Sequence, residues 1–297
     1  MAKVAQKLDV YTEITNQIIA AIEKGADKFQ MPWHRTGTAT MSPMNIDTGN
    51  AYRGINIVSL WAAAQVRNFD TGIWGTYRQW QNAGCQVRKG EKSSLVIFYK
   101  EFERDDEDSD RNDEQPRKRL MARASRVFNV AQVDGYTPEA VEPVANPVAP
   151  IDAADRFITA TKAKISHGGE SAYYAPATDA IQMPPRESFH GTATSSATEA
   201  YYSTLLHELT HWSGHKSRCD RFTDGAFKKD DYAREELVAE LGAAFLCGHL
   251  GVTLEPRPDH AAYIDHWLKI LKADSKAIFQ ASSQATKAVD FLKGLQA

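Results

Sequence analysis

The chain has 297 residues and a formal net charge of −3, with 35 Lys and Arg against 38 Asp and Glu. Its composition is that of a soluble globular protein, and without a long apolar run or a signal peptide we expect neither a transmembrane nor a secreted protein. The length predicts two domains. Three cysteines without C-x-x-C spacing fit a reducing compartment, so we expect a cytoplasmic protein without a membrane partner.

The charge is uneven along the chain. Residues 1–126 hold 19 basic and 16 acidic side chains, but nine of these acids and only two of the bases lie in 101–114. Outside that acidic stretch the balance is 17 basic to 7 acidic, which favours an anionic partner. We expect residues 101–115 to form a solvated loop. Alternatively, the carboxylates of this loop mimic phosphates and compete for the basic surface.

The first part of the chain has the pattern of an α+β domain. Isoleucines at helical spacing predict an amphipathic helix from Val10 to Gly25, and further helices are expected at 54–67 and 76–82. Two strands are predicted at 94–99 and 122–133, with the acidic loop between them.

Aromatic and basic side chains are interleaved in the same part of the chain. Cations neutralise phosphates and aromatic faces stack on unpaired bases, so the combination favours binding to DNA or RNA. The candidate nucleic-acid-binding residues are Trp33, Arg35, Tyr52, Arg53, Trp74, Tyr77, Arg78, Arg88, Lys89 and Lys92. Trp61 and Trp80 lie on predicted helices and are expected in the core instead. Arg-Gly and Lys-Gly turns also occur in proteins that touch no nucleic acid, so this pattern alone leaves the partner open.

A boundary is predicted at residues 137–150, where four prolines in fourteen residues favour an extended linker. We therefore place one domain at 1–136 and a second at 151–297. The second is predicted to be α+β and mostly helical, with helices at 151–164, 196–213, 233–249, 259–272 and 275–293.

A hairpin is expected between the first two of these helices. Strands near 171–175 and 180–183 flank a turn that contains Asp179. In many zinc peptidases a strand beside the metal helix binds the substrate through main-chain hydrogen bonds. The strand at 180–183 is a candidate for this role; the alternative is a plain structural edge strand.

The most informative motif is His207-Glu208-Leu209-Thr210-His211, an H-E-x-x-H pattern within a predicted helix. Histidines at i and i+4 lie one turn apart on one face, so both imidazoles can bind one metal ion. Glu208 is placed to take a proton from a water molecule at that metal and is the candidate catalytic residue. The alternative is a chance match, because the motif fixes only three residue types.

The helix at 233–249 supplies the rest of the predicted site. Glu236 and Glu240 are spaced one turn apart on a largely apolar helix, where unpaired carboxylates would be costly to bury. A Glu from a following helix is a common third zinc ligand, and a further acid can hold a ligand His in its tautomer. We assign Glu236 as the metal ligand and Glu240 as the acid that holds a ligand His in its tautomer. The reverse assignment is left open. Glu235 is expected to face solvent. The alternative is an ordinary helix pair with surface carboxylates.

The joint pattern resembles the ArdC antirestriction family of conjugative plasmids over nearly the whole chain. The segments that carry the resemblance are Tyr52–Asn56, Val127–Val133, His207–His215 and Glu235–Leu246. Membership implies a bacterial protein with an N-terminal single-stranded-DNA-binding domain and a metallopeptidase-like domain. It also implies a role in protecting incoming plasmid DNA from host restriction enzymes. The metal motifs are similar to those of thermolysin-like zinc peptidases, except that Glu240 stands where those enzymes often have Asp.

We therefore predict an antirestriction protein that binds single-stranded DNA and carries a zinc metallopeptidase-like site. Zinc, or another divalent metal, would be held by His207, His211 and Glu236, and the expected partners are single-stranded DNA and restriction enzymes or other DNA-bound proteins. Two alternatives stay open. One is a zinc protease that degrades proteins bound or crosslinked to DNA. The other is a non-catalytic protein that occludes DNA and has a structural metal.

Overall fold

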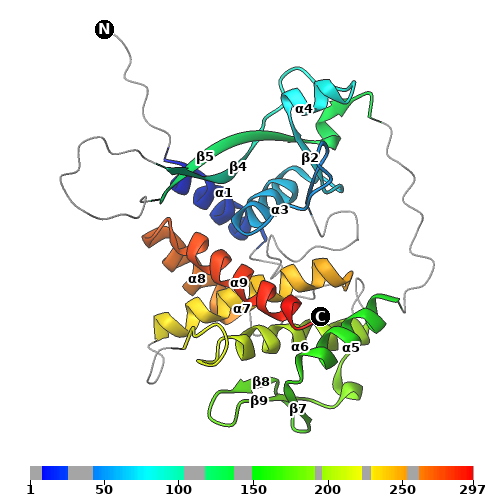
Figure 1. Ribbon diagram of the computed structural model, residues 1–297, viewed down its shortest axis with the longest axis vertical. Helices are drawn as coiled ribbons and strands as arrows, with labels where there is room; N and C mark the ends of the chain where they lie inside the picture. Colours follow the sequence, from blue (N-terminus) through cyan, green and yellow to red (C-terminus); the bar gives the residue numbers. More distant parts are fainter. Residues whose placement is uncertain are drawn as a thin grey trace, which may run out of the picture.

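The structure is a computed structural model that describes residues 9–25, 43–103, 118–136, 149–190, 196–222, 229–252 and 261–296. Figure 1 shows a twisted sheet with helices beside it at one end of the molecule, further helices in the middle and a small sheet at the other end. This arrangement confirms the predicted α+β class. No helix in these ranges is both long and apolar enough to cross a membrane.

The N-terminal half is built on a four-stranded sheet with the order β1-β2-β5-β4. The strands β4 and β5 form a long antiparallel ladder, and β2 pairs with the other side of β5. A separate two-stranded sheet pairs β3 with β6. The bounds are α1 (Val10–Gly25), β1 (Met44–Asn45), α3 (Ile55–Arg67), β2 (Ile73–Thr76), α4 (Tyr77–Asn82), β3 (Gln86–Val87), β4 (Ser94–Glu103), β5 (Lys118–Asn129), the 3-10 turn η2 (Val130–Gln132) and β6 (Val133–Asp134).

The helix α3 covers the free edge of β4. The buried Asn56 amide donates to the Ile97 carbonyl over 2.8 Å and accepts from the Ile97 N–H over 2.7 Å, and the Ser59 hydroxyl donates to the Leu95 carbonyl. These bonds satisfy main-chain groups that an edge strand would otherwise expose. The edge strand is therefore closed to pairing along this stretch.

The C-terminal half places a small sheet against a group of helices. The sheet has the order β7-β9-β8, with β7 parallel and β8 antiparallel to β9. The bounds are α5 (Ala149–Thr161), β7 (Lys164–His167), β8 (Tyr173–Ala175), β9 (Ala180–Met183), η3 (Arg186–Ser188), α6 (Ala197–Ser213), α7 (Lys229–Leu250), α8 (Ala261–Ala273) and α9 (Ala277–Gly294). The helix α7 packs along both α6 and α9.

One apolar core runs through both halves. It joins isoleucines of α1 and Trp61 of α3 to side chains of α6, α7 and α9. Trp61 and Phe245 lie with ring centroids 5.9 Å apart, and Arg53 pairs with Asp290 of α9. The predicted linker lies mostly outside the described residues, so the boundary at 137–150 stays a prediction. The shared core nevertheless means that each half covers apolar surface of the other.

Most predicted helices and strands are confirmed within a few residues. The helix predicted to reach Lys164 ends at Thr161, because Lys162 adopts a left-handed conformation (φ 56°) and the chain then enters β7. The predicted acidic loop begins too early, since residues 101–103 still belong to β4; residues 104–117 lie outside the described part. The short strands β1, β2, β3 and β7 are not predicted by the sequence. The strand predicted at 122–133 ends as β5 at Asn129, because η2 interrupts it, and only its last residue, Val133, lies in β6.

Candidate metal centre

The helix α6 has well-defined ends. Ser196 caps it: its hydroxyl accepts from the Glu199 N–H, while the Glu199 carboxylate accepts from the Ser196 N–H. This reciprocal capping box satisfies donors that helix starts leave open. The helix ends at Ser213, two residues after the H-E-x-x-H segment, with Gly214 as its C-cap. His207 and Glu208 are both buried, so the motif faces the interior and not bulk water.

The helices α6 and α7 approach closely beside this motif. A Cβ atom on Gly242 of α7 would lie only 2.4 Å from the Thr210 Cγ2 atom of α6. Only glycine permits this approach without a shift of one helix. The close contact brings the acidic residues of α7 to the two histidines.

Three candidate ligand side chains converge. The Nε2 atoms of His207 and His211 are 3.1 Å apart, and they lie 3.5 and 3.4 Å from the carboxylate oxygens of Glu236. One donor atom from each residue falls within a mutual distance of 4.8 Å. Ligands about 2.1 Å from a tetrahedral zinc ion are separated by about 3.4 Å. The spacing and the N,N,O chemistry therefore fit a divalent cation.

A second acidic residue stands behind each histidine. Glu240 Oε1 lies 2.9 Å from Nδ1 of His207, and Glu235 Oε1 lies 3.2 Å from Nδ1 of His211. A carboxylate at Nδ1 favours the tautomer with the proton there, which leaves the Nε2 lone pair for a metal. The prediction that Glu235 faces solvent is wrong: its side chain is 9% exposed, because α7 is enclosed on this side by the segment after α6.

The electrostatics of the cluster favour a positive charge. Burial lowers the pKa of His211, but its hydrogen bonds to Glu235 and Glu236 and their negative charges raise that pKa to about 10. Burial raises the pKa of Glu236, but hydrogen bonds from the two histidines bring it well below its usual range. Carboxylates around two imidazoles thus stabilise a proton or a cation at this point.

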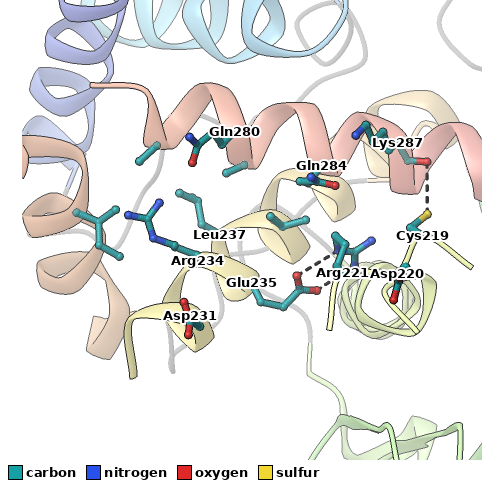
Figure 2. Close-up of a pocket in the computed structure, with 14 residues that line it drawn as sticks. Cys219, Asp220, Arg221, Asp231, Arg234, Glu235, Leu237, Gln280, Gln284 and Lys287 are labelled. Carbon is teal, nitrogen blue, oxygen red and sulfur yellow. Dashed lines mark hydrogen bonds and ion pairs between the residues drawn. The ribbon is translucent and has the colours of Figure 1, made fainter. Parts of the chain in front are cut away.

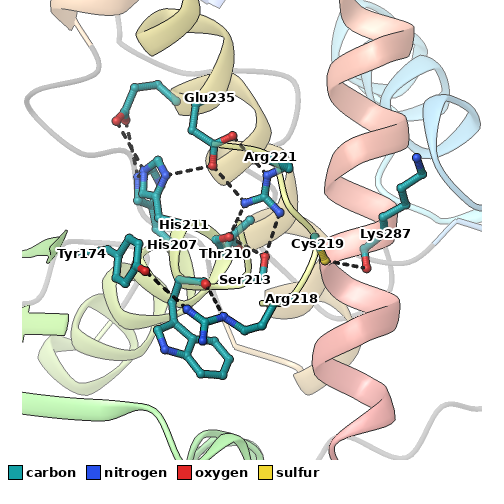
Figure 3. Close-up of polar contacts among 12 residues, drawn as sticks. Tyr174, His207, Thr210, His211, Ser213, Arg218, Cys219, Arg221, Glu235 and Lys287 are labelled. Carbon is teal, nitrogen blue, oxygen red and sulfur yellow. Dashed lines mark hydrogen bonds and ion pairs between the residues drawn. The ribbon is translucent and has the colours of Figure 1, made fainter. Parts of the chain in front are cut away.

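Two arginines after α6, Arg218 and Arg221, form ion pairs with carboxylates. Figure 3 shows Arg221 against Glu235 and Arg218 directed toward Tyr174. Arg218 pairs with Asp179 of the hairpin turn, donates to the Trp212 carbonyl and lies 3.8 Å from the Trp212 ring centroid. These contacts fix the β8–β9 hairpin to the end of α6.

The hairpin and its Asp179 turn are confirmed, but the role predicted for its second strand is wrong. The strand at 180–183 is β9, which pairs with β7 on one side and β8 on the other. Both of its edges are occupied, so it can neither bind a peptide by strand addition nor serve as a plain edge strand.

Arg221 and Glu235 also line a cavity of about 700 Å³. Figure 2 shows labelled lining residues on α7, on α9 and on the segment after α6, and Ile270 of α8 also lines the cavity. The three candidate metal ligands do not line it. The ion pair therefore separates this cavity from the ligand cluster.

The predicted nucleic-acid residues divide into buried and exposed groups. Tyr52 and Trp74 are buried in a core cluster with Leu60 and Val96, so their rings are covered by protein. Assigning these two as stacking platforms was wrong; their aromatic character serves packing. Trp61 and Trp80 are in the core, as predicted. Trp33 and Arg35 lie outside the described residues.

The remaining candidates are at the surface. Tyr77 is 44% exposed, and Arg78, Lys89 and Lys92 are exposed. Tyr77 and Lys89 line an open cavity of about 550 Å³ together with Arg88, whose guanidinium also pairs with Glu91 and Asp134. Arg53 is exposed but paired with Asp290. The structure therefore brings Tyr77, Arg88 and Lys89 together and leaves Arg53 elsewhere.

Comparisons with known proteins agree with this geometry. Residues 152–284 match a family model described as a zincin-like metallopeptidase, a class that fits the helix pair and its candidate ligands. Residues 8–128 match the N-terminal domain of anti-restriction factor ArdC. The crystal structure of antirestriction ArdC protein from the R388 plasmid, metal-free, is similar with a TM-score of 0.77 and 39% identity, over 97% of this chain and 98% of that chain.

Further relatives extend the comparison. The Mn(II)-bound structure of the same ArdC protein matches with a TM-score of 0.76 over 98% of this chain and 99% of that one, at 39% identity. Uncharacterized protein y4eC of Sinorhizobium fredii is 47% identical over 97% of this chain and 92% of that protein. DNA primase TraC of Escherichia coli is 33% identical over 96% of this chain, which spans only 27% of that protein. The chain belongs to the ArdC antirestriction family.

Proposed function

We propose that this protein binds single-stranded DNA and protects incoming plasmid DNA from host restriction, and that its helix pair forms a metal-dependent peptidase site. The observation that carries the proposal is the likeness to the ArdC protein over almost the entire chain at 39% identity. The converging His207, His211 and Glu236 side chains support the second part.

The metal would be held by His207, His211 and Glu236. Zinc suits two imidazole nitrogens and one carboxylate oxygen, and three protein ligands leave a position open for substrate or water. A divalent cation bound there would polarise a peptide carbonyl and lower the pKa of a water molecule. Glu240 and Glu235 would hold the two imidazoles in the ligand tautomer through their Nδ1 atoms.

Glu208 would act as the general base. It is buried on α6 directly after His207, within the H-E-x-x-H segment. It would take the proton from the attacking water and pass it to the leaving amine. Replacing it by Gln removes the base but keeps size and hydrogen-bonding capacity, so this variant separates catalysis from metal binding.

The DNA surface would be centred on Tyr77, Lys89 and the neighbouring Arg78 and Lys92. These side chains are exposed and carry the cations and the aromatic face that binding to a single strand needs. Such side chains bind the backbone and stack on any base, so we expect little sequence preference.

The test of the DNA surface uses the full chain, because the N-terminal half shares its core with the C-terminal half. Lys89→Ala combined with Lys92→Ala should weaken single-strand binding and reduce its salt slope by about 0.7 for each phosphate that the variant no longer neutralises. The control is Lys216→Ala, which removes an exposed charge from the other half. Equal binding by the double variant and the wild type would contradict this surface.

The test of function is plasmid transfer into a restricting host. Cells that make the wild-type protein should receive unmodified plasmid more often than cells without it. Glu208→Gln with normal metal content then decides the mechanism. Loss of protection would support peptidase chemistry, whereas full protection would favour DNA occlusion with a structural metal. No protection by the wild type would refute the antirestriction role.

A further inference from the structure

Arg221 is a charged side chain placed deep against the candidate metal site. Its side chain is only 4% exposed. Nε donates to Glu235 Oε2 over 3.1 Å and Nη2 to Glu235 Oε1 over 2.9 Å, so the guanidinium grips both carboxylate oxygens. Its other donors reach the Ser213 hydroxyl and the Thr210 carbonyl of α6. A two-pronged contact of this kind fixes the plane of the carboxylate as well as its distance.

The chain after α6 is folded to bring this guanidinium there. The Arg221 N–H donates to the Gly214 carbonyl over 2.9 Å, which returns the segment onto the last turn of the helix. A Cβ atom on Gly214 would lie 2.9 Å from Arg221 Nη2 and 2.7 Å from Phe222 Cζ. The absence of a side chain at Gly214 therefore admits the guanidinium.

The contact continues to a metal ligand. Glu235 Oε1, which accepts from Arg221, is also 3.2 Å from Nδ1 of His211. Figure 3 shows this side of the site, where the Glu235 carboxylate lies between the guanidinium and the imidazole. The arginine, the carboxylate and the imidazole thus form a continuous polar chain that ends at a candidate ligand.

We infer that Arg221 is a positioning residue of the metal site, which orients His211 by fixing the carboxylate of Glu235. The inference rests on the proposed metal site and adds the residue that sets the geometry of one ligand. Without the two hydrogen bonds from Arg221, the Glu235 carboxylate could rotate, and His211 Nε2 would no longer be held toward Glu236. Groups behind a ligand typically change metal affinity by about 10- to 100-fold.

The experiment measures zinc affinity of the full chain in competition with a chelating dye. Arg221→Gln should bind zinc at least tenfold more weakly than the wild type. Arg221→Lys should lose less affinity, because lysine keeps the positive charge but cannot donate to both oxygens of Glu235 as the guanidinium does. The matched control is Arg234→Gln. Arg234 lines the same cavity and precedes Glu235, but the described contacts do not join it to that carboxylate. We expect its affinity within twofold of the wild type.

A double variant tests whether Arg221 acts through Glu235. In a Glu235→Gln background, Arg221→Gln should cause no further loss of zinc affinity. The double variant removes both buried charges together, so neither charge is left unpaired in the fold. The visible absorption of bound Co(II) gives a second readout, because it reports ligand geometry and would not change if Arg221 only stabilised the loop.

Three results would overturn the inference. One is wild-type zinc affinity in Arg221→Gln, and another is a loss that adds fully to that of Glu235→Gln. If Arg221→Gln does not fold, the third result is wild-type zinc affinity together with an unchanged Co(II) spectrum in Arg221→Lys. Failure of the wild type itself to bind zinc would instead refute the proposed metal site and the inference with it.

Discussion

The close approach of α6 and α7 gives a prediction that joins stability to metal binding. In Gly242→Ala, the new Cβ would lie 2.4 Å from Thr210 Cγ2 and 2.8 Å from Thr210 Oγ1, where ordinary contacts are 3.4–4 Å. One helix must therefore move by about 1 Å. Overpacking of this kind costs about 1–3 kcal/mol, offset by about 1 kcal/mol because Ala favours a helix over Gly.

The net loss of about 0–2 kcal/mol corresponds to a fall in Tm of at most roughly 8 °C. The same movement separates the histidines of α6 from Glu236 of α7, and a displacement above about 0.5 Å degrades a metal site. We expect zinc affinity to fall at least tenfold, measured by competition with a chelating dye alongside thermal melting.

Two further variants make the reasoning refutable. Thr210→Ala removes the two atoms within 3.0 Å and leaves only the Thr210 Cβ, at 3.2 Å, so the double variant with Gly242→Ala should recover most of the stability and zinc affinity lost in Gly242→Ala alone. Gly294→Ala near the end of α9 meets no atom within 4 Å and should leave both quantities near their wild-type values. Wild-type Tm and affinity in Gly242→Ala, or no rescue by the double variant, would show that this contact does not set the distance between the helices.

Three other predictions concern stability and the metal. The hydrogen bond from Arg218 lowers the pKa of Asp179, so the Asp179 carboxylate stabilises the fold fully above about pH 4, the ordinary pKa range of an unfolded Asp. This stabilisation disappears as the pH falls through the lowered pKa. Asp179→Asn should therefore reduce Tm at pH 7, and its difference in Tm from the wild type should shrink toward pH 3; a difference that stays constant would contradict the ion pair. Trp74→Ala should cost about 3–5 kcal/mol in denaturant unfolding, because the ring is 1% exposed; a loss below 1 kcal/mol would show that the ring is not core. Adding zinc at 100 times its Kd should stabilise the wild type by about 2.7 kcal/mol and a chelator should reverse this, while His211→Asn should show no shift in Tm.

The candidate metal ligands were accessible to sequence reasoning because their spacing is local. His207 and His211 are one turn apart, and Glu236 and Glu240 repeat the same interval on a helix that is apolar almost throughout. Helical periodicity alone therefore predicts which side chains share a face. How the two helices meet could not be predicted, since it depends on the contact of Gly242 with Thr210.

The contacts that support the site escaped prediction because they are made between different elements, and helical or strand periodicity describes only one element at a time. Glu235 was expected at the surface, but the segment after α6 places Arg221 against it. The strand β9 has the sequence of an ordinary hairpin strand, and only its parallel pairing with β7 makes it central. Trp74 lies in a four-residue strand that contains a glycine, which is too short for alternation to reveal.

Anomalous diffraction from crystals of the full chain, grown or soaked with zinc, would test the proposed metal centre at the level of its individual ligands. We expect one strong zinc peak per chain within about 2.0–2.2 Å of His207 Nε2, His211 Nε2 and a Glu236 oxygen. We also expect Glu240 and Glu235 to remain at the two Nδ1 atoms, without contacting the metal. A peak bound elsewhere, or ligation by Glu240 in place of Glu236, would contradict the proposed centre.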